Sequence, residues 1–179
     1  MVKVFVEETG FERGRVMGIG GILDCTRMAH FVADELGVSP RDVTAMVVGS
    51  HTKRMVPIPE FTRVNGIPLE MLMEESSINR IVENTRLAGS TIVDLAKRSN
   101  AYYAPSAAIA QVVEAVAIDT HKVLSVSVLL EGEYGVNGIA LSVPCRVGDR
   151  GVEEILKVDF DDDIIRQIRD SAELVRSWF

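Results

Sequence analysis

Three residues in the first third of the chain are of types that could transfer a proton on an organic acid. Asp24 and Arg27 are three positions apart, which places both side chains on one face of a helix. His51 follows an apolar run where the chain turns, and histidine titrates near neutral pH. A carboxylate can hold an imidazole in one tautomer, the imidazole can transfer a proton at a carbonyl or hydroxyl oxygen, and a guanidinium can bind a carboxylate with two hydrogen bonds. This set suits a 2-hydroxy or 2-oxo acid, and any hydride must come from a cofactor because no side chain donates one.

Each of these residues also has an ordinary structural interpretation. An acid and an arginine at this spacing commonly form a surface ion pair that contributes only a few tenths of a kcal/mol. A single histidine in a loop is most often structural, and we assign His30 and His121 to that class. Asp24 and Arg27 are set apart by an apolar context directly behind a glycine-rich turn, which is where a helix end faces a cleft.

The stretch GIGGILDCTR, residues 18–27, raises the alternative of a dinucleotide-binding loop. That loop requires Gly-x-Gly-x-x-Gly, and Gly18 and Gly20 match its first two glycines. Leu23 stands where the third glycine should be, and no acid follows a second strand about twenty residues later. We therefore expect the glycines to form a tight turn and the chemistry to belong to Asp24 and Arg27.

The composition of the 179 residues fits one domain, with 47% hydrophobic and 25% charged residues. A net charge of -7 gives no reason to expect binding to nucleic acid or to an anionic membrane. We expect no transmembrane segment, no signal peptide and no metal site. Cys25 and Cys145 are expected to be buried thiols in a reducing cytoplasm. A cysteine nucleophile is poorly supported, since the neighbouring Asp24 disfavours a thiolate.

The pattern of apolar residues predicts an α+β fold in which long helices pack with antiparallel strands. A turn-rich EGEYGVNG joins the last two predicted strands, which indicates an antiparallel pair. The helix rich in alanine and valine is expected to be largely buried. The predicted strands are residues 15–19, 43–49, 123–130 and 139–145, and the predicted helices are 24–36, 77–98, 105–120 and one that begins at the acids 161–163.

Several motifs resemble the NAD-dependent lactate/malate dehydrogenases, and most closely the malate dehydrogenases of the lactate-dehydrogenase-like branch. The motifs are GFERGRVMGIGGILDCTRMAHFVADEL, VVGSHTKRMVPIP, VNGIPL, SNAYYAPSAAIAQVVEAV and LLEGEYGVNGIALSVPCRVG. The resemblance covers essentially the whole chain. It implies the C-terminal, substrate-binding half of the enzyme, without the N-terminal Rossmann domain. Residues 1–18 would be the last helix and strand of the nucleotide-binding domain, and residues 19–179 the substrate-binding domain.

The resemblance also implies roles for individual residues. Asp24 matches the acid that orients the catalytic histidine, Arg27 the arginine that binds the substrate carboxylate, and His51 the proton donor and acceptor. The segment from Ala101 to Ser106 matches one wall of the substrate pocket. NAD is the implied cofactor and a small dicarboxylate the implied substrate. The implied partners are further copies of the chain in a homo-oligomer or a separate nucleotide-binding half.

Two departures from the family pattern lead to further expectations. The family has His-Gly-Asp where this chain has His51, Thr52 and Lys53. Threonine resists backbone angles that glycine allows, and a cation near an imidazole disfavours its protonated form, so we expect impaired activity. The strand RVMGI, residues 15–19, would lack its sheet, so we expect residues 1–18 to be disordered, refolded or paired with another chain.

Two functions are consistent with these residues and motifs. The first is the catalytic, substrate-binding half of a malate dehydrogenase, which interconverts malate and oxaloacetate and is inactive without a nucleotide-binding half. The alternative is a non-catalytic module that binds a dicarboxylate or assembles with intact dehydrogenase subunits. The pairing of Asp24, Arg27 and His51 favours the first function, and the Thr52 and Lys53 departure favours the second.

Overall fold

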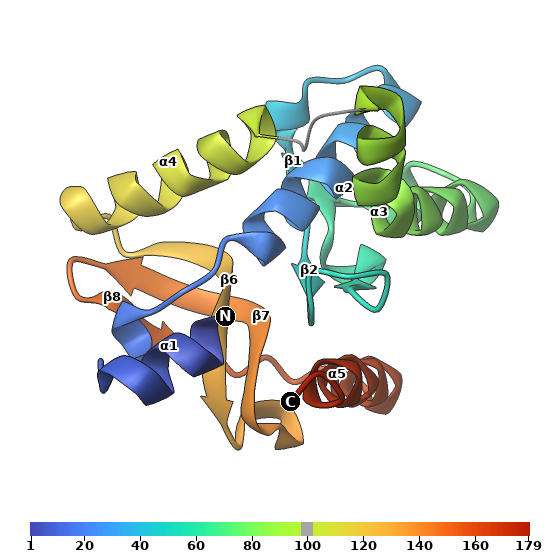
Figure 1. The fold of residues 1–179 in the computed structure, drawn as a ribbon. Helices are drawn as coiled ribbons and strands as arrows, with labels where there is room; N and C mark the ends of the chain where they lie inside the picture. Colours follow the sequence, from blue (N-terminus) through green and yellow to red (C-terminus); the bar gives the residue numbers. More distant parts are fainter. Residues whose placement is uncertain (98–101) are drawn as a thin grey trace.

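The computed structural model describes residues 1–97 and 102–179, and its ribbon is shown in Figure 1. The prediction for Ala101 lies outside the described residues. The α+β architecture is as predicted, with antiparallel sheets packed against helices. The helices are α1 (Val2–Thr9), α2 (Gly20–Leu36), α3 (Glu75–Ala96), α4 (Tyr103–Ala117) and α5 (Asp162–Arg176), and the strands are β1 (Val43–Thr44), β2 (Val47–Val48), β3 (Val56–Pro57), β4 (Arg63–Val64), β5 (Ile67–Pro68), β6 (Lys122–Glu131), β7 (Asn137–Gly148) and β8 (Gly151–Ile155).

The largest sheet has the order β6-β7-β8, with antiparallel pairing throughout. Alternate residues of β6 are buried, as expected for a strand with one face against a core. β7 is buried along most of its length, and α5 packs its apolar side on this sheet through Ile164, Ile168 and Ala172. The predicted antiparallel pair of strands is confirmed, while β8 was not predicted.

Helix α2 connects the large sheet to a second cluster of buried residues. Its inner face contributes Met28, Val32 and Ala33 to a core that also includes Val47 and Leu69. The helix ends at Gly37, whose φ of 67° supplies the left-handed cap expected there. It begins at Gly20, four residues earlier than predicted, because both glycines of the turn adopt helical geometry. Asp24 therefore lies in the second turn of the helix.

The predicted strand 43–49 is divided between two small sheets. β1 pairs with β4, and β2 pairs with β3 in a short hairpin. Beyond β2, Gly49 forms two hydrogen bonds of 2.8 Å with Ser142 of β7. The loop that carries His51 thus starts from a fixed contact with the large sheet.

The predictions for the first 18 residues and for the 105–120 helix need correction. Residues 15–19 form no strand: a 3-10 helix spans Arg13–Arg15, and Gly18 makes only a local pair with Ser127 of β6. Within this short apolar run, Gly18 is the residue that pairs with a strand, at the edge of the large sheet. Residues 1–18 are not disordered, because α1 lies against β6 and β7. Helix α4 is mostly exposed, with only Ala108 and Ala115 buried among its described residues.

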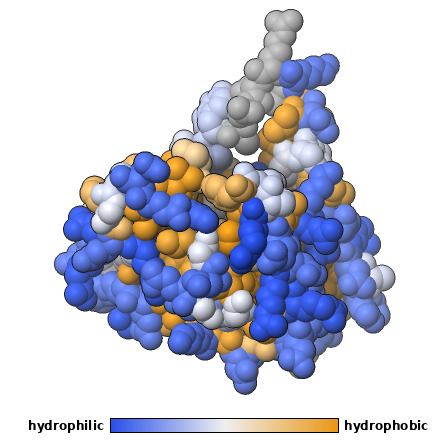
Figure 2. All heavy atoms as spheres, turned by 60° about the horizontal axis from the view of Figure 1, so that its bottom comes forward, coloured by the Kyte–Doolittle hydropathy of each residue, from blue (hydrophilic) through white to orange (hydrophobic). Residues whose placement is uncertain are grey.

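The arrangement in Figure 1 leaves the two ends of the chain close together at the bottom of the molecule, beside α1 and α5. The ammonium of Lys3 lies 5.1 Å from the ring centre of Phe179. Figure 2 turns this side forward and shows apolar side chains interrupting its hydrophilic surface. Among the described residues, none of the helices has the length and hydropathy needed to cross a bilayer.

Candidate active site

The structure brings Asp24 and His51 into direct contact. Nδ1 of His51 lies 2.8 Å from Oδ2 of Asp24, whose side chain is only 2% exposed. A carboxylate can only accept, so Nδ1 carries the hydrogen and Nε2 is left as the nitrogen that can accept a proton. The His51 side chain is 45% exposed, so a substrate can reach it. This is the arrangement in which an acid orients a histidine for proton transfer.

Arg27 binds the other oxygen of the same carboxylate. Its Nη1 donates to Oδ1 of Asp24 over 3.2 Å, one helical turn away. The cation offsets the charge of an acid that would otherwise be buried without a partner. Nε of Arg27 is buried and has no hydrogen-bond partner among the described residues. Arg27 also lines a cavity beside His51, and Nη1 is the guanidinium nitrogen that Asp24 occupies, which leaves Nη2 as a donor for a further acceptor.

A cavity of about 190 Å³ opens beside His51 and Arg27. Arginine, lysine and histidine side chains dominate its charge, and its described lining contains no carboxylate. Such a cavity attracts an anionic ligand. The lining residues are Arg27, His51, Thr52, Lys53, Met55, Arg86, Gly89 and Ser90.

The glycine-rich stretch serves close packing instead of phosphate binding. A Cβ at Gly20 would lie 2.6 Å from Cβ of His51, and one at Gly21 would lie 2.5 Å from the carbonyl oxygen of Ser125. Both polar backbone groups of Gly18 are already bonded to Ser127. Protein atoms occupy the space beside both glycines, so these glycines permit close packing of α2 against His51 and Ser125.

The backbone strain expected at Thr52 is not present. Thr52 is not among the described residues with positive φ, and the left-handed glycine of this loop is Gly49, with φ of 87°. Oγ1 of Thr52 lies 2.9 Å from Oγ of Ser50 and accepts from the amide of Arg54 over 3.0 Å. Threonine thus fits the loop and adds hydrogen bonds that a glycine could not form.

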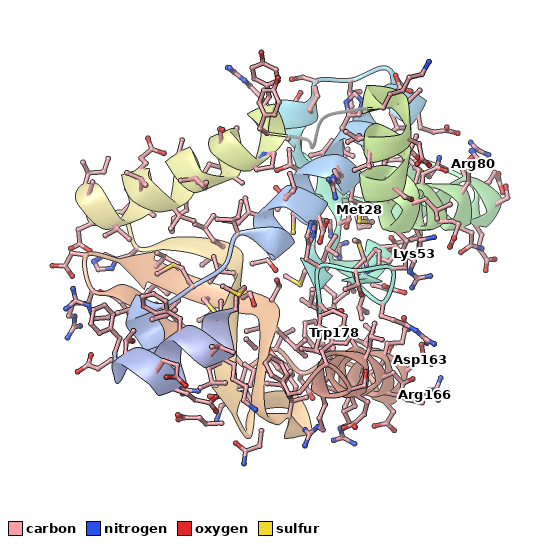
Figure 3. All side chains as sticks on the ribbon, in the orientation of Figure 1. Met28, Lys53, Arg80, Asp163, Arg166 and Trp178 are labelled. Atoms are coloured by element: carbon pink, nitrogen blue, oxygen red, sulfur yellow. The ribbon has the colours of Figure 1, made fainter. Side chains whose placement is uncertain are left out.

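Lys53 lies at the outer edge of the cavity, between α3 and α5 (Figure 3). No carboxylate of the described residues lies within ion-pairing distance of its ammonium. The nearby Arg86 has a weak contact of 3.8 Å to Glu83. Glu83 and Asp170 line an adjoining cavity together with these two cations. Lys53 therefore adds a positive charge without an ion pair of its own among the described residues, whereas Glu83 offsets part of the charge of Arg86.

Ser106 is not brought to this cavity. It is exposed in the first turn of α4, and its hydroxyl donates to the carbonyl oxygen of Tyr102 over 2.7 Å. That helical bond occupies the hydroxyl, and Ser106 is not among the residues lining the cavity beside His51. Its role in substrate binding stays a prediction.

The remaining candidates of the sequence have structural surroundings. Burial raises the pKa of the Cys25 thiol to about 12 and that of Cys145 also to about 12, so both thiols stay protonated at neutral pH. His121 does not line the cavity, and its Nδ1 contacts Glu153 over 2.9 Å. Arg146 also binds Glu153, over 3.2 Å. Neither cysteine nor His121 takes part in the cavity.

Sequence reasoning missed two features of the site. The close approach of Gly20 to His51 joins residues 31 positions apart, and Ser171 of α5 bonds to Ser50, in the loop that carries His51, from 121 positions away. The only sequence signal was the density of hydroxyls and glycines around His51, in GSHT. Such a signal indicates a tightly bonded loop without naming its distant partner.

The fold and the site define a class of protein: an α+β domain in which a buried acid joins a histidine and an arginine that line a cavity. The chain belongs to the lactate/malate dehydrogenase family, because the model of its alpha/beta C-terminal domain matches residues 22–177. The resemblance found in the sequence is confirmed.

Relatives and solved structures agree with this assignment. A malate dehydrogenase of Methanosarcina mazei is 46% identical over 173 residues, covering 97% of this chain and 56% of the relative. One from Thermomicrobium roseum is 47% identical, covering 98% and 57%. The structure of the Aeropyrum pernix malate dehydrogenase superposes with a TM-score of 0.95 at 37% identity, covering 99% of this chain and 59% of that one. The chain spans about half the length of the curated relatives it matches and corresponds to their C-terminal half.

Proposed function

We propose that this chain provides the substrate-binding and proton-transferring part of an NAD-dependent malate dehydrogenase, which interconverts malate and oxaloacetate. The observation that carries the proposal is the buried carboxylate of Asp24 held between His51 and Arg27. NAD, when bound, accepts or supplies the hydride. The described residues offer no dinucleotide cradle, so a nucleotide-binding region, in a longer protein or on a partner chain, holds NAD in this proposal. We expect the 179 residues alone to be inactive.

His51 carries the proton in this proposal. When malate is oxidised, Nε2 accepts the proton of the 2-hydroxyl group, and in the reverse direction it returns a proton to the 2-oxo oxygen. Asp24 keeps the imidazole in the tautomer with the hydrogen on Nδ1 and stabilises the imidazolium that forms. Arg27 contacts the same carboxylate and opposes its negative charge.

Two carboxylates of the substrate have separate partners. Arg27 binds the carboxylate next to the reacting carbon with the donors that Asp24 leaves free. Lys53 and Arg86 line the same cavity and favour a second anionic group at its outer side. A small dicarboxylate therefore suits this cavity better than a monocarboxylate with an apolar tail.

A second candidate is a non-catalytic module that binds a dicarboxylate or assembles with other dehydrogenase subunits. Exposed apolar residues on α3 and α4 favour assembly: Leu87, Ile92, Val93, Leu95, Ile109 and Val113. A groove of about 620 Å³ between α2 and these helices has mainly apolar walls. Homo-oligomer formation remains part of both proposals. The cytoplasm is the proposed compartment, since both cysteines are free.

The test combines cofactor binding with reconstitution. We expect NADH fluorescence to be unchanged by the 179-residue chain alone. Adding the nucleotide-binding region of a relative, such as the Thermomicrobium roseum enzyme, should give malate-dependent reduction of NAD that the variant His51→Gln lacks. Saturable NADH binding by the chain alone would contradict the missing cofactor site. Complex formation without any malate oxidation would favour the non-catalytic module.

A further inference from the structure

A chain of hydroxyl groups connects helix α5 to the loop that carries His51. Oγ of Ser171, in the middle of α5, accepts from the amide of Ser50 over 2.8 Å and donates to Oγ of Ser50 over 2.8 Å. Ser171 is fully buried and Ser50 is 6% exposed. A buried amide and two buried hydroxyls thus satisfy one another, and each would lack a partner if the chain were broken.

The chain of hydroxyls continues across the loop. Because Oγ of Ser50 accepts from Ser171, its own proton can be donated to Oγ1 of Thr52, 2.9 Å away. Oγ1 of Thr52 also accepts from the amide of Arg54 over 3.0 Å. The amide of Thr52 donates to the carbonyl of Ser50, and the amide of Met55 donates to the carbonyl of Thr52. The loop from 50 to 55 is therefore closed around the side chain of Thr52.

The anchor at the other end of this chain is rigid. Ser171 lies between Ile168 and Ala172, which are buried in the main core. A Cβ at Gly49 would lie 2.9 Å from Oγ of Ser171, so the loop approaches α5 as closely as a glycine permits. Gly49 is also bonded to Ser142 of β7. The hydroxyl chain therefore ties the loop to a part of the fold that cannot shift without disturbing the core.

We propose that Thr52 and Ser171 are positioning residues for His51. Through Ser50 they hold the loop so that Nδ1 of His51 stays on Asp24 and Nε2 faces the cavity. His51 is half-exposed and has one side-chain bond, to Asp24, among the described residues, so its orientation depends on its backbone. This inference rests on the proposed function in taking His51 as the proton-transferring group. It also gives the side chain at position 52 a purpose that a glycine could not serve.

The first test observes His51 in the whole 179-residue chain. The variant Thr52→Val keeps the shape and removes the hydroxyl, while Thr52→Ser retains it. We expect the hydrogen on Nδ1 of His51, followed by NMR, to exchange with solvent roughly five- to tenfold faster in Thr52→Val and in Ser171→Ala, and Thr52→Ser to behave as the unmodified chain. The control Thr91→Val removes an exposed hydroxyl that bonds only within α3, and it should change nothing.

Thermal unfolding of the same variants separates positioning from loss of the fold. Ser171→Ala leaves a buried amide without its partner and can lower stability. The decisive variant is therefore Thr52→Val, because Thr52 is only half-buried. A folded Thr52→Val chain whose Nδ1 hydrogen exchanges as slowly as in the unmodified chain would overturn the proposal. Faster exchange in the equally stable Thr91→Val control would overturn it as well.

The second test uses the enzyme reconstituted with a nucleotide-binding region. We expect Thr52→Val to lower kcat about tenfold with KM for malate within twofold, and Thr52→Ser to restore kcat. An unchanged kcat in Thr52→Val contradicts the positioning role. If the unmodified reconstituted enzyme does not oxidise malate, the proposed function fails. The exchange rate of the His51 hydrogen in the 179-residue chain then still decides whether Thr52 positions the imidazole.

Discussion

The loop that carries His51 and the first 18 residues are attached to the same sheet in very different ways. The loop is bonded to three elements: His51 to Asp24 of α2, Gly49 to Ser142 of β7, and Ser50 to Ser171 of α5. Asp24, Ser142 and Ser171 are all buried. The first segment has a helix, α1, none of whose eight described residues is buried. Its polar contacts with the sheet include the pairing of Gly18 with Ser127 and the bonds that Arg13 makes to Leu129 and Glu133. Its apolar contact with the main core includes the partly buried Met17.

This difference indicates that the first segment can open locally while the site stays intact. Buried, mutually bonded groups open only when the core opens, whereas exposed helices with few buried contacts open locally at low cost. The geometry of His51 should therefore survive changes in α1, and the segment should loosen without loss of the site. Substitutions in the site and in the segment should therefore have separate effects.

The largest effect is expected from the acid and histidine themselves. In the reconstituted enzyme, His51→Gln should lower kcat by about 10²- to 10⁴-fold, because His51 is the cavity-lining group that Asp24 orients for proton transfer. Asp24→Asn should cause a comparable loss, since an amide no longer selects the tautomer. The control is His30→Gln, at an exposed histidine on the same helix as Asp24, and it should retain full activity. Equal activity in His51→Gln and His30→Gln would remove His51 from the mechanism.

A smaller effect is expected from crowding the site. In Gly20→Ala the new Cβ would meet Cβ of His51 at 2.6 Å, so either the helix or the loop must shift. We expect a loss of about 1–3 kcal/mol in the free energy of unfolding, measured with urea, and faster exchange of the His51 hydrogen. Gly89→Ala is the matched control, because its Cβ would make an ordinary contact of 3.5 Å with Arg27. The control should gain up to about 1 kcal/mol, as alanine favours a helix interior over glycine. Equal losses in both variants would contradict the close packing of Gly20.

The sequence predicted those parts of the structure that depend on local patterns. The pairing of β6 with β7 followed from alternating residues around a turn, and α2 from its helical spacing and its terminal Gly37. The contact of Asp24 with His51 came from the chemistry of the residue types together with the family resemblance. Local spacing and residue chemistry were enough for these features.

Features set by distant contacts could not be predicted. The helix start at Gly20 depends on the packing of His51 against that glycine, and the loop depends on Ser171. Helix α4 looked buried because it is rich in alanine and valine, yet burial depends on which neighbours exist. The apolar run 15–19 resembled a strand, but strand formation needs a partner, and only Gly18 has one.

A moderate effect is expected at the edge of the site, at Lys53. In Lys53→Asp the reversed charge should raise KM for malate about fivefold, because the cavity loses an uncompensated cation. The same change should raise kcat by a few-fold, since a negative charge near His51 stabilises the positive charge that the ring acquires during proton transfer. Steady-state kinetics of the reconstituted enzyme measure both values. Lys97→Asp, at an exposed lysine outside the cavity, should leave both unchanged. Unchanged KM in Lys53→Asp would contradict the binding of a second carboxylate there.

The smallest effect concerns the attachment of the first segment, and it depends on pH. Burial alone would raise the pKa of Glu133, but hydrogen bonds from Arg13 and from the amides of Glu131 and Glu133 hold that pKa below its ordinary value of 4.5. The stabilisation is therefore complete above pH 4.5 and is lost as the pH falls through the lower pKa of the folded state. Its size is about 1 kcal/mol, as expected for one partly exposed ion pair.

Hydrogen exchange in α1 measures this loss directly. Below pH 4.5 the amides of α1 should lose protection, corrected for the intrinsic pH dependence of exchange, while the amides of β6 and β7 keep theirs. Glu133→Gln should give the weaker protection at every pH, because the neutral amide cannot oppose Arg13 as a carboxylate does. Glu131→Gln, at a more exposed carboxylate 3.4 Å from the same guanidinium, is the control and should have a smaller effect. If α1 and the large sheet lose protection together, the segment opens only with the core, and the separation between site and segment is wrong.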